Sequence, residues 1–238
     1  MKDFSDGDQA AVWSDTSALL AKPGAIARPV PGAAPAKGYR DRGKRLFDVA
    51  LVVLTLPFTL PLILLPALVL ACLGHGAFYV QRRLGRDGRG FYMVKLRTMV
   101  PDADRMLQDC LDRDPALRRE WDRTQKLKHD PRITRLGRFL RRSSLDELPQ
   151  IWHVLTGEMS LVGPRPMMPH QLELYGDPRA YAALRPGITG LWQVMERNEA
   201  DFASRARADR EYDRVCSFPT DLKLIARTVG VVFRGTGY

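Results

Sequence analysis

The stretch VALVVLTLPFTLPLILLPALVLACL, residues 49–73, contains no charged side chain and determines how the rest of the sequence is interpreted. At about 1.5 Å of rise per residue, a helix of this length can cross a hydrocarbon core of roughly 30 Å. The stretch begins well inside the chain and is longer than the apolar region of a signal peptide, so we expect the mature protein to keep it. The sequence therefore predicts a membrane helix.

Prolines and flanking charges indicate how this helix meets the membrane. Pro57, Pro61 and Pro66 each remove a backbone donor, so we expect the helix to bend near its middle. Basic residues stand on both sides of the stretch: Lys37, Arg40, Arg42, Lys44 and Arg45 before it, and Arg82, Arg83, Arg86 and Arg89 after it. Because basic flanks favour the cytoplasmic side, we predict a re-entrant helix that enters the inner leaflet and returns, with a kinked single span as the alternative.

The composition of the 238-residue chain points to an anionic partner. The chain has 37 Lys and Arg against 27 Asp and Glu, a net charge of +10, which is typical of proteins that bind phosphate, nucleic acid or a lipid surface. Only 8% of the residues are aromatic, which provides poorly for base stacking and argues against nucleic acid. Three widely spaced cysteines argue against a disulfide framework, and the four histidines show no paired metal-ligand spacing.

The other segments predict a mostly helical α/β fold with a small β-hairpin. Residues 1–38 show no periodic pattern of apolar side chains, so we expect a disordered tail. Residues 39–75 are expected to form the membrane helix with its basic lead-in. Residues 76–238 are expected to form a cytoplasmic domain at the membrane surface. The segment FYVQRRLGRDGRGFYMVKLRTM, residues 78–99, predicts a hairpin around Asp87-Gly88. Its second arm carries Met93, Lys95 and Arg97 on one face, which we expect to be cationic and accessible.

Three later segments predict helices. Residues 102–128 are expected to form a solvated helix or helix pair. RITRLGRFLRR, residues 132–142, places apolar side chains on one side of a helix and arginines, Arg132 among them, on the others, which suits a helix lying on anionic lipid. A salt-bridged surface helix gives nearly the same pattern. Residues 221–233 are also amphipathic, although core packing would produce that pattern too.

The stretch SSLDELPQ, residues 143–150, carries the candidate chemistry. Ser144 and Glu147 have the spacing of a capping box, which would place Asp146 and Glu147 in a first helical turn, where the helix dipole favours acids. Spacing alone does not separate a structural cap from a functional site. Adjacent carboxylates can also hold a hard cation such as Mg²⁺, and an ionised Asp can attack phosphorus.

A second motif, Gly163-Pro164-Arg165-Pro166, follows shortly afterwards. The two prolines stiffen the backbone around Arg165, whose guanidinium can bind phosphate oxygens bidentately; a structural turn with an exposed arginine is the alternative. The sequence has no GxSxG elbow, no GxxxxGK[ST] loop and no GxGxxG after a strand. Serine hydrolases, Walker-type NTPases and Rossmann folds are therefore disfavoured.

In their order along the chain, these motifs resemble the bacterial sugar transferase family, the monotopic polyprenol-phosphate phosphoglycosyl transferases. The resemblance runs from about Lys44 to the C-terminus and is carried by KRLFDVAL, VKLRTM, LDELPQ, SLVGPRP and RPGITG. It implies transfer of a hexose-1-phosphate from a UDP-sugar, UDP-galactose or UDP-glucose, to undecaprenyl phosphate, which releases UMP and initiates an exopolysaccharide repeat unit. The GTGY ending is most similar to the ExoY-type branch, which favours galactose.

The resemblance also implies roles for individual residues. Asp146 is the expected nucleophile of a covalent phosphosugar intermediate, with Glu147 beside it and Mg²⁺ held by both. The remaining matches are to substrate-binding positions: Lys95, Arg141 and Arg165 as phosphate-contacting cations, and Asp209 as a further acid.

Two positions depart from the family pattern. The family's re-entrant helix breaks at a Ser-Pro pair, which here corresponds to Leu60-Pro61, so Pro61 is the expected membrane kink although the serine is missing. Residues 195–198, MERN, lack the glycine that relatives carry before Arg-Asn, so specificity for the sugar or nucleotide is expected to differ if that loop contacts the substrate.

The implied protein is an enzyme on the cytoplasmic face of the bacterial inner membrane. Its expected partners are the UDP-sugar, undecaprenyl phosphate and the inner leaflet, with no nucleic acid, and a homo-oligomer is left open. Two alternatives remain. One is direct transfer in a ternary complex, with Asp146 only holding metal, and the other is a membrane-tethered basic protein that binds anions.

Overall fold

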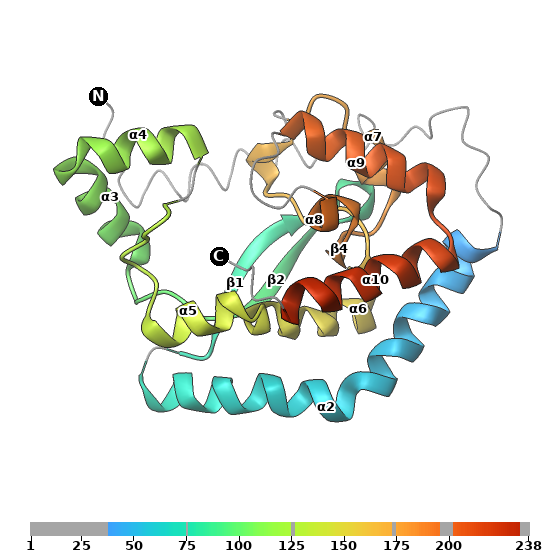
Figure 1. Ribbon diagram of the computed structural model, residues 1–238, viewed down its shortest axis with the longest axis horizontal. Helices are drawn as coiled ribbons and strands as arrows, with labels where there is room; N and C mark the ends of the chain where they lie inside the picture. The colour runs from blue at the N-terminus through green and yellow to red at the C-terminus, as the bar shows by residue number, and fades with distance from the viewer. Residues whose placement is uncertain (1–37, 75, 125–126, 173–174, 196–201, 234–238) are drawn as a thin grey trace. The chain divides into compact units, whose positions relative to one another are not determined.

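The structure of the chain, a computed structural model, describes residues 38–233 except 75, 125–126, 173–174 and 196–201 (Figure 1). It contains two compact units. Unit 1 comprises Met1–Thr55, Val80–Met93 and Gln150–Gly230, and unit 2 comprises Leu56–Tyr79, Val94–Pro149 and Val231–Tyr238. Of the tail expected at residues 1–38, residues 1–37 lie outside the described residues, and the segment 76–238 contributes to both units.

Helices account for most of the described elements, as the sequence predicts. In chain order the elements are η1 Tyr39–Gly43, α2 Lys44–Cys72, β1 Phe78–Leu84, η2 Arg86–Gly88, β2 Gly90–Leu96, α3 Ala103–Arg113, α4 Pro115–Thr124, α5 Arg135–Arg142, η3 Leu145–Gln150, α6 Ile151–Thr156, β3 Ser160–Val162, η4 Pro169–Gln171, α7 Arg179–Ala183, β4 Gly187–Thr189, α8 Leu191–Met195, α9 Phe202–Val215 and α10 Phe218–Phe233. The helix pair expected within residues 102–128 is confirmed as α3 and α4.

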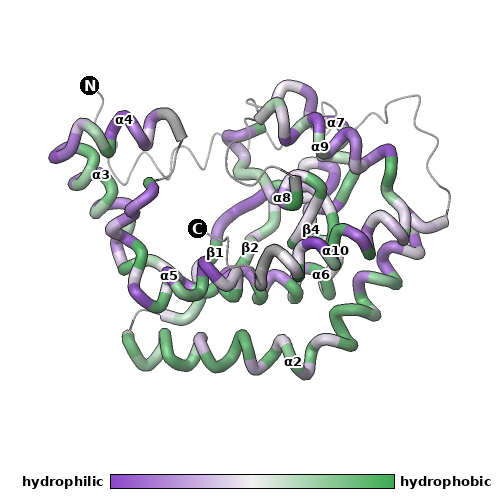
Figure 2. Tube along the Cα trace, viewed as in Figure 1, coloured by the Kyte–Doolittle hydropathy of each residue, from purple (hydrophilic) through white to green (hydrophobic). Residues whose placement is uncertain are grey.

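The apolar stretch forms α2, which continues as one helix through all three of its prolines. Figure 2 shows α2 as predominantly hydrophobic beyond its first turns, which carry Lys44, Arg45 and Asp48. Among the described residues it is the one helix long and apolar enough to cross a membrane, and only 11% of its most apolar window is buried. Leu54 and Phe58 are 72% and 75% exposed. The core helix of a soluble protein would bury such side chains. The exposed apolar surface of α2 is therefore typical of a helix that is covered by lipid or by a partner.

The predicted β-hairpin is confirmed as β1 and β2. Asp87 and Gly88 at its tip have φ of 59° and 71°, the positive values that a tight hairpin turn requires. The expectation that the second arm presents an accessible cationic face is wrong, because that face is not freely accessible. Met93 is buried, and the Lys95 ammonium lies 2.6 Å from a Glu147 carboxylate oxygen.

The core of unit 2 joins the apolar helix to β2 and α5. Ala67 and Leu70 of α2 pack with Leu96 of β2 and Leu140 of α5. Leu145, the residue before Asp146, packs against the same cluster. The candidate acids therefore follow directly on a residue that packs against a cluster to which the apolar helix contributes.

Helix α5 begins later than the sequence pattern predicts. Thr134 is its N-cap and accepts a hydrogen bond from the Gly137 N–H at 2.9 Å. Arg132 consequently lies outside the helix, where it is buried and forms a two-point ion pair with Asp130 (2.9 and 2.7 Å). The expectation that Arg132 belongs to a lipid-facing arginine surface is therefore wrong, because its charge is neutralised inside the unit.

The core of unit 1 contains a short parallel strand pair that the sequence analysis missed. Strands β3 and β4 pair in register, with Ser160 opposite Gly187 and Val162 opposite Thr189. The backbones approach so closely that a Cβ on Gly163 would lie 2.2 Å from the Arg185 carbonyl oxygen. The Gly-Pro-Arg-Pro motif is thus fixed directly after β3.

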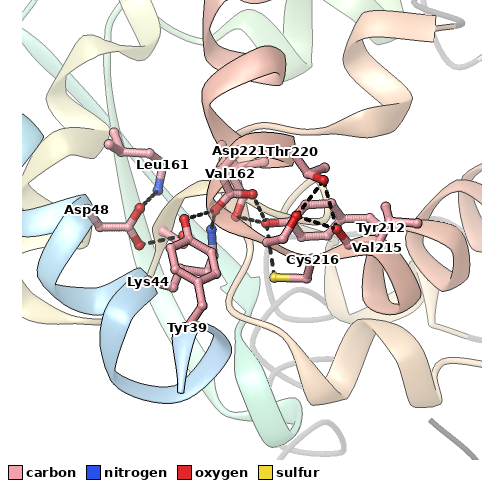
Figure 3. A network of polar contacts seen from close by, with 12 residues as sticks. Tyr39, Lys44, Asp48, Leu161, Val162, Tyr212, Val215, Cys216, Thr220 and Asp221 are labelled. Carbon is pink, nitrogen blue, oxygen red and sulfur yellow. Dashed lines mark hydrogen bonds and ion pairs between the residues drawn. The ribbon is translucent and has the colours of Figure 1, made fainter. Parts of the chain in front are cut away.

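A buried polar network in unit 1 connects the start of α2 to α10 (Figure 3). Asp221 of α10 is fully buried and accepts hydrogen bonds from the Lys44 ammonium at 2.6 Å and from the hydroxyls of Tyr39 at 2.7 Å and Tyr212 at 2.6 Å. One turn after Lys44, Asp48 accepts from the Ser160 hydroxyl at 2.6 Å. The first turns of α2 are therefore anchored to protein before the exposed apolar part begins.

Candidate active site

The candidate acids lie at the start of the 3₁₀ helix η3, directly after α5. Ser144 adopts φ of 58°, a left-handed conformation that is uncommon for residues other than glycine and that turns the chain from α5 into η3. Asp146 and Glu147 occupy the first turn of η3, as predicted. Asp146 is buried, with 9% exposure, while the side chain of Glu147 is 27% exposed.

Lys95 holds the second acid in place. Its ammonium lies 2.6 Å from Glu147 Oε1, and the two side chains are about one-fifth to one-quarter exposed (19% and 27%). An ion pair that is partly shielded from water in this way is stronger than one on an open surface. The pairing brings together two residues that are 52 positions apart in sequence.

Arg141 is oriented by a residue that the sequence analysis did not single out. Its Nε donates a hydrogen bond of 2.9 Å to the hydroxyl of Thr98, which is buried. Helix α5 carries Arg141 and contacts Thr98 closely, since a Cβ on Gly137 would lie 1.9 Å from the Thr98 carbonyl oxygen. Thr98 thus fixes both the helix and the direction of its guanidinium. The motif VKLRTM contains Thr98 but gives no indication of this contact.

The charges around Asp146 shift its pKa in opposite directions. Burial and the neighbouring Glu147 carboxylate raise the pKa of Asp146 to about 6, and the positive charges of Lys95 and Arg141 counteract them. Burial in turn lowers the pKa of Arg141, which the Asp146 carboxylate partly restores. Asp146 is therefore an ionised but poorly solvated carboxylate at neutral pH, which is a suitable state for a nucleophile.

The remaining predicted site residues belong to unit 1. Arg165 is exposed between the buried Pro164 and Pro166, and its guanidinium lies 5.7 Å from the centre of the Trp192 ring. The guanidinium of Arg205 lies 4.4 Å from the same ring. Burial and the charge of Arg165 lower the pKa of Arg205 to about 10. Neither Trp192, which follows the RPGITG motif, nor Arg205 was singled out from the sequence, because no pattern indicates that both arginines lie against this ring.

Asp209 is buried in unit 1 and accepts a hydrogen bond from the hydroxyl of Tyr175, a core residue. Burial raises its pKa to about 8, so the carboxyl group is mostly protonated at neutral pH. The substrate-binding role implied for Asp209 stays a prediction. The departure at residues 195–198 falls largely outside the described residues.

The donors available for a metal ion are the two adjacent carboxylates. Among the described residues no group of three or more His, Cys, Asp or Glu side chains could hold a metal. Mg²⁺ does not need such a cage, because it is usually bound by one or two carboxylates together with water and substrate phosphates. Asp146 and Glu147 supply oxygen ligands of the required kind and so fit Mg²⁺ better than a zinc or structural metal site.

Known proteins with similar sequences were found over most of the chain. The UDP-galactose-lipid carrier transferase of Erwinia amylovora is 46% identical over 82% of this chain and 41% of its own length. The exopolysaccharide production protein ExoY of Sinorhizobium fredii is 43% identical over 82% of this chain and 87% of its own length. The undecaprenyl-phosphate galactose phosphotransferase of Salmonella typhimurium is 42% identical over 82% of this chain and 41% of its own length.

The chain thus spans less than half of two of these relatives and most of the third. A model of the family "Bacterial sugar transferase" matches residues 39–235, which include α2, the Asp-Glu pair, Lys95, Arg141 and the Gly-Pro-Arg-Pro motif. Family membership and the clustered acids and cations of unit 2 agree with the resemblance drawn from the motifs. The chain belongs to the bacterial sugar transferase family.

Proposed function

We propose that this protein transfers a hexose-1-phosphate from a UDP-sugar to undecaprenyl phosphate, releasing UMP and initiating exopolysaccharide assembly. The observation that carries the proposal is the buried Asp146, set between Glu147, Lys95 and Arg141 in a unit whose core includes the apolar helix α2. UDP-galactose is the first candidate donor, because relatives over 40% identical are named for galactose transfer. UDP-glucose is the second.

We infer a two-step reaction with Asp146 as nucleophile. A carboxylate oxygen of Asp146 attacks the phosphorus that bears the sugar, and the bond to the bridging oxygen breaks so that UMP leaves with the electron pair. An oxygen of the lipid phosphate then attacks the same phosphorus and displaces Asp146, which regenerates the carboxylate. Lys95 and Arg141 of unit 2 would neutralise the phosphate charge that otherwise repels an anionic attacker, and the substrate-binding role of Arg165 in unit 1 stays a prediction.

Mg²⁺ would be held by Asp146 and Glu147 and would supply charge neutralisation to the substrate phosphates. The protein's own contribution is the position and charge of its side chains. Thr98 directs Arg141, and Lys95 restrains Glu147, so the cations are oriented before substrate arrives.

We also propose a monotopic arrangement of the protein at the cytoplasmic face of the inner membrane. One substrate is water-soluble and the other keeps its phosphate at the headgroups, so the reaction requires a site at the bilayer surface. The exposed apolar side chains of α2 support membrane insertion, and basic residues on both sides of the stretch support a re-entrant path with Pro61 at the kink. Labelling of the N-terminal tail from either side of sealed vesicles separates this arrangement from a single span.

Release of UMP from a panel of UDP-sugars, with undecaprenyl phosphate in nanodiscs, tests the proposed activity. We expect release with UDP-galactose or UDP-glucose, and the absence of release with every UDP-sugar would contradict the proposal. Incubation with a donor labelled in the sugar phosphate, without acceptor, separates the two-step route from direct transfer. Only the two-step route leaves the label on the protein.

The raised pKa of Asp146 predicts a pH dependence of the donor reaction. Because only the carboxylate attacks, kcat/KM for the UDP-sugar should fall about tenfold per pH unit as the pH drops below about 6. Glu147→Gln removes a charge that raises this pKa, so the acid limb of its remaining activity should move to lower pH. Lys95→Met removes a charge that lowers it, so that limb should move to higher pH. An acid limb near the usual pKa of Asp, about 4, in the unaltered protein would contradict the prediction.

The Thr98–Arg141 hydrogen bond predicts a positioning effect. Thr98→Val keeps the shape of the side chain but leaves the Arg141 Nε donor without its acceptor, so we expect kcat/KM to fall roughly tenfold to a hundredfold. Thr98→Ser retains the hydroxyl and should restore most of the activity. Steady-state kinetics of the two variants, with thermal unfolding of each, provides the comparison. Equal activity of the Val and Ser variants would exclude the positioning role.

A further inference from the structure

Arg97 lies where the chain leaves the apolar helix. Helix α2 ends at Cys72, and the strand that follows begins with Phe78 and Tyr79, whose side chains are 42% and 45% exposed. Arg97 Nη2 donates a hydrogen bond of 3.2 Å to the Phe78 carbonyl oxygen. Exposed aromatic side chains beside the end of a membrane helix favour the headgroup level, so under the proposed membrane arrangement the guanidinium of Arg97 would lie at the depth of lipid phosphates.

The strand directs Arg97 to the same side as the candidate acids. Leu96 is buried in the cluster with Ala67 and Leu70 of α2, so its side chain points toward the apolar helix. The Arg97 N–H donates to the Ala77 carbonyl oxygen at 2.9 Å, which continues the pairing of the hairpin beyond β2. Because side chains alternate along a strand, Arg97 leaves from the same face as Lys95, which contacts Glu147.

The guanidinium of Arg97 has hydrogen-bonding capacity left over. Its Nε is buried and has no hydrogen-bond partner among the described residues, and the backbone of Gly76 lies against it, since a Cβ there would be 3.8 Å from Nε. A buried donor without an acceptor raises the free energy of the folded protein unless a ligand or a water molecule accepts its hydrogen bond. A phosphate monoester is the natural complement, since a guanidinium offers it two parallel donors.

We propose that Arg97 binds the phosphate group of the lipid acceptor and presents it to the site formed by Lys95, Asp146 and Glu147. This inference rests on the proposed function and adds to it a residue specific for the acceptor half of the reaction. The donor is soluble and need not approach the end of the apolar helix, whereas the lipid phosphate is confined to that depth.

The test uses the full-length protein in nanodiscs with Arg97→Gln, Arg97→Lys and, as a control for lost charge, Arg105→Gln on the exposed surface of α3. For Arg97→Gln we expect the KM for undecaprenyl phosphate to rise about tenfold to a hundredfold, with an unchanged UMP burst before acceptor is added and an unchanged KM for the UDP-sugar. Arg97→Lys, which keeps the charge but loses the two-donor fork, should fall in between, and Arg105→Gln should match the unaltered protein.

The size of the burst counts correctly folded sites, so partial misfolding lowers it without imitating a change in KM. A slower burst or a raised donor KM would assign Arg97 to the UDP-sugar and overturn the proposal, as would unaltered kinetics for both substrates. Absence of UMP release from the unaltered protein would contradict the proposed function instead, and is therefore distinguishable from failure of the Arg97 proposal.

Discussion

Asp146→Asn is expected to lower sugar-phosphate transfer by about a thousandfold or more, because the amide keeps the shape of the side chain but cannot attack phosphorus. The substitution should not unfold the protein. It removes a carboxylate that burial disfavours, as the raised pKa of about 6 indicates, so the free energy of unfolding should stay constant or increase. UMP release in nanodiscs and labelling by the donor phosphosugar measure the effect, and both should be lost together.

Two controls make this prediction specific. Asp109→Asn removes a carboxylate from the exposed surface of α3 and should leave transfer unchanged. Binding of the Asp146→Asn protein to liposomes should equal that of the unaltered protein, since α2 is untouched. Substantial transfer by Asp146→Asn would remove the nucleophile assignment and favour direct transfer in a ternary complex. Loss of transfer with persistent labelling would place the covalent bond on another residue.

Local sequence signals predicted the elements that depend on local physics. The apolar run predicted α2 because an uncharged stretch of this length is typical of a membrane helix, and Asp87-Gly88 predicted the hairpin because both residues tolerate positive φ. The helix pair α3 and α4 followed from charge and periodicity. In each case the residues that determine the element lie close together in the sequence.

Elements that depend on distant partners could not be predicted in the same way. Strands β3 and β4 have three residues each, too few for an alternating pattern, and they are specified by close approach of glycine backbones. Arg132 looked like one more arginine of a basic helix, although Asp130, two residues earlier, neutralises it in the core. Periodicity does not reveal which charge of a run has a buried partner.

The same distinction applies to the candidate site. Asp146, Glu147, Lys95 and Arg141 were identified through motifs, and the structure joins Lys95 to Glu147 and sets Arg141 within electrostatic range of Asp146. Thr98 was missed because its contribution is a single hydrogen bond across 43 positions of sequence. Residues that position others carry no chemical signature of their own, so only the three-dimensional contacts identify them.

The polar network at the start of α2 predicts the largest effect on stability. Asp221 is fully buried and neutralises the Lys44 ammonium, which is itself only 9% exposed. Asp221→Asn keeps the volume of the side chain but removes the carboxylate that forms the ion pair with the buried Lys44 ammonium, which then keeps its electrostatic interaction with Asp48, so we expect the free energy of unfolding to fall by about 3–5 kcal/mol. Thermal and denaturant unfolding of the detergent-solubilised protein measures the loss.

A double variant separates the lost ion pair from the lost hydrogen bonds. Lys44→Met combined with Asp221→Asn removes both charges, and because the cost in the single variant comes mainly from the unpaired ammonium, the double variant should recover a large part of the stability. Asp177→Asn is the matched control, since its ion pair with Arg179 is exposed and its removal should change stability little. If Asp221→Asn were as stable as this control, the anchoring of α2 would rest on apolar contacts such as that between the rings of Phe47 and Phe218, and not on the buried charges.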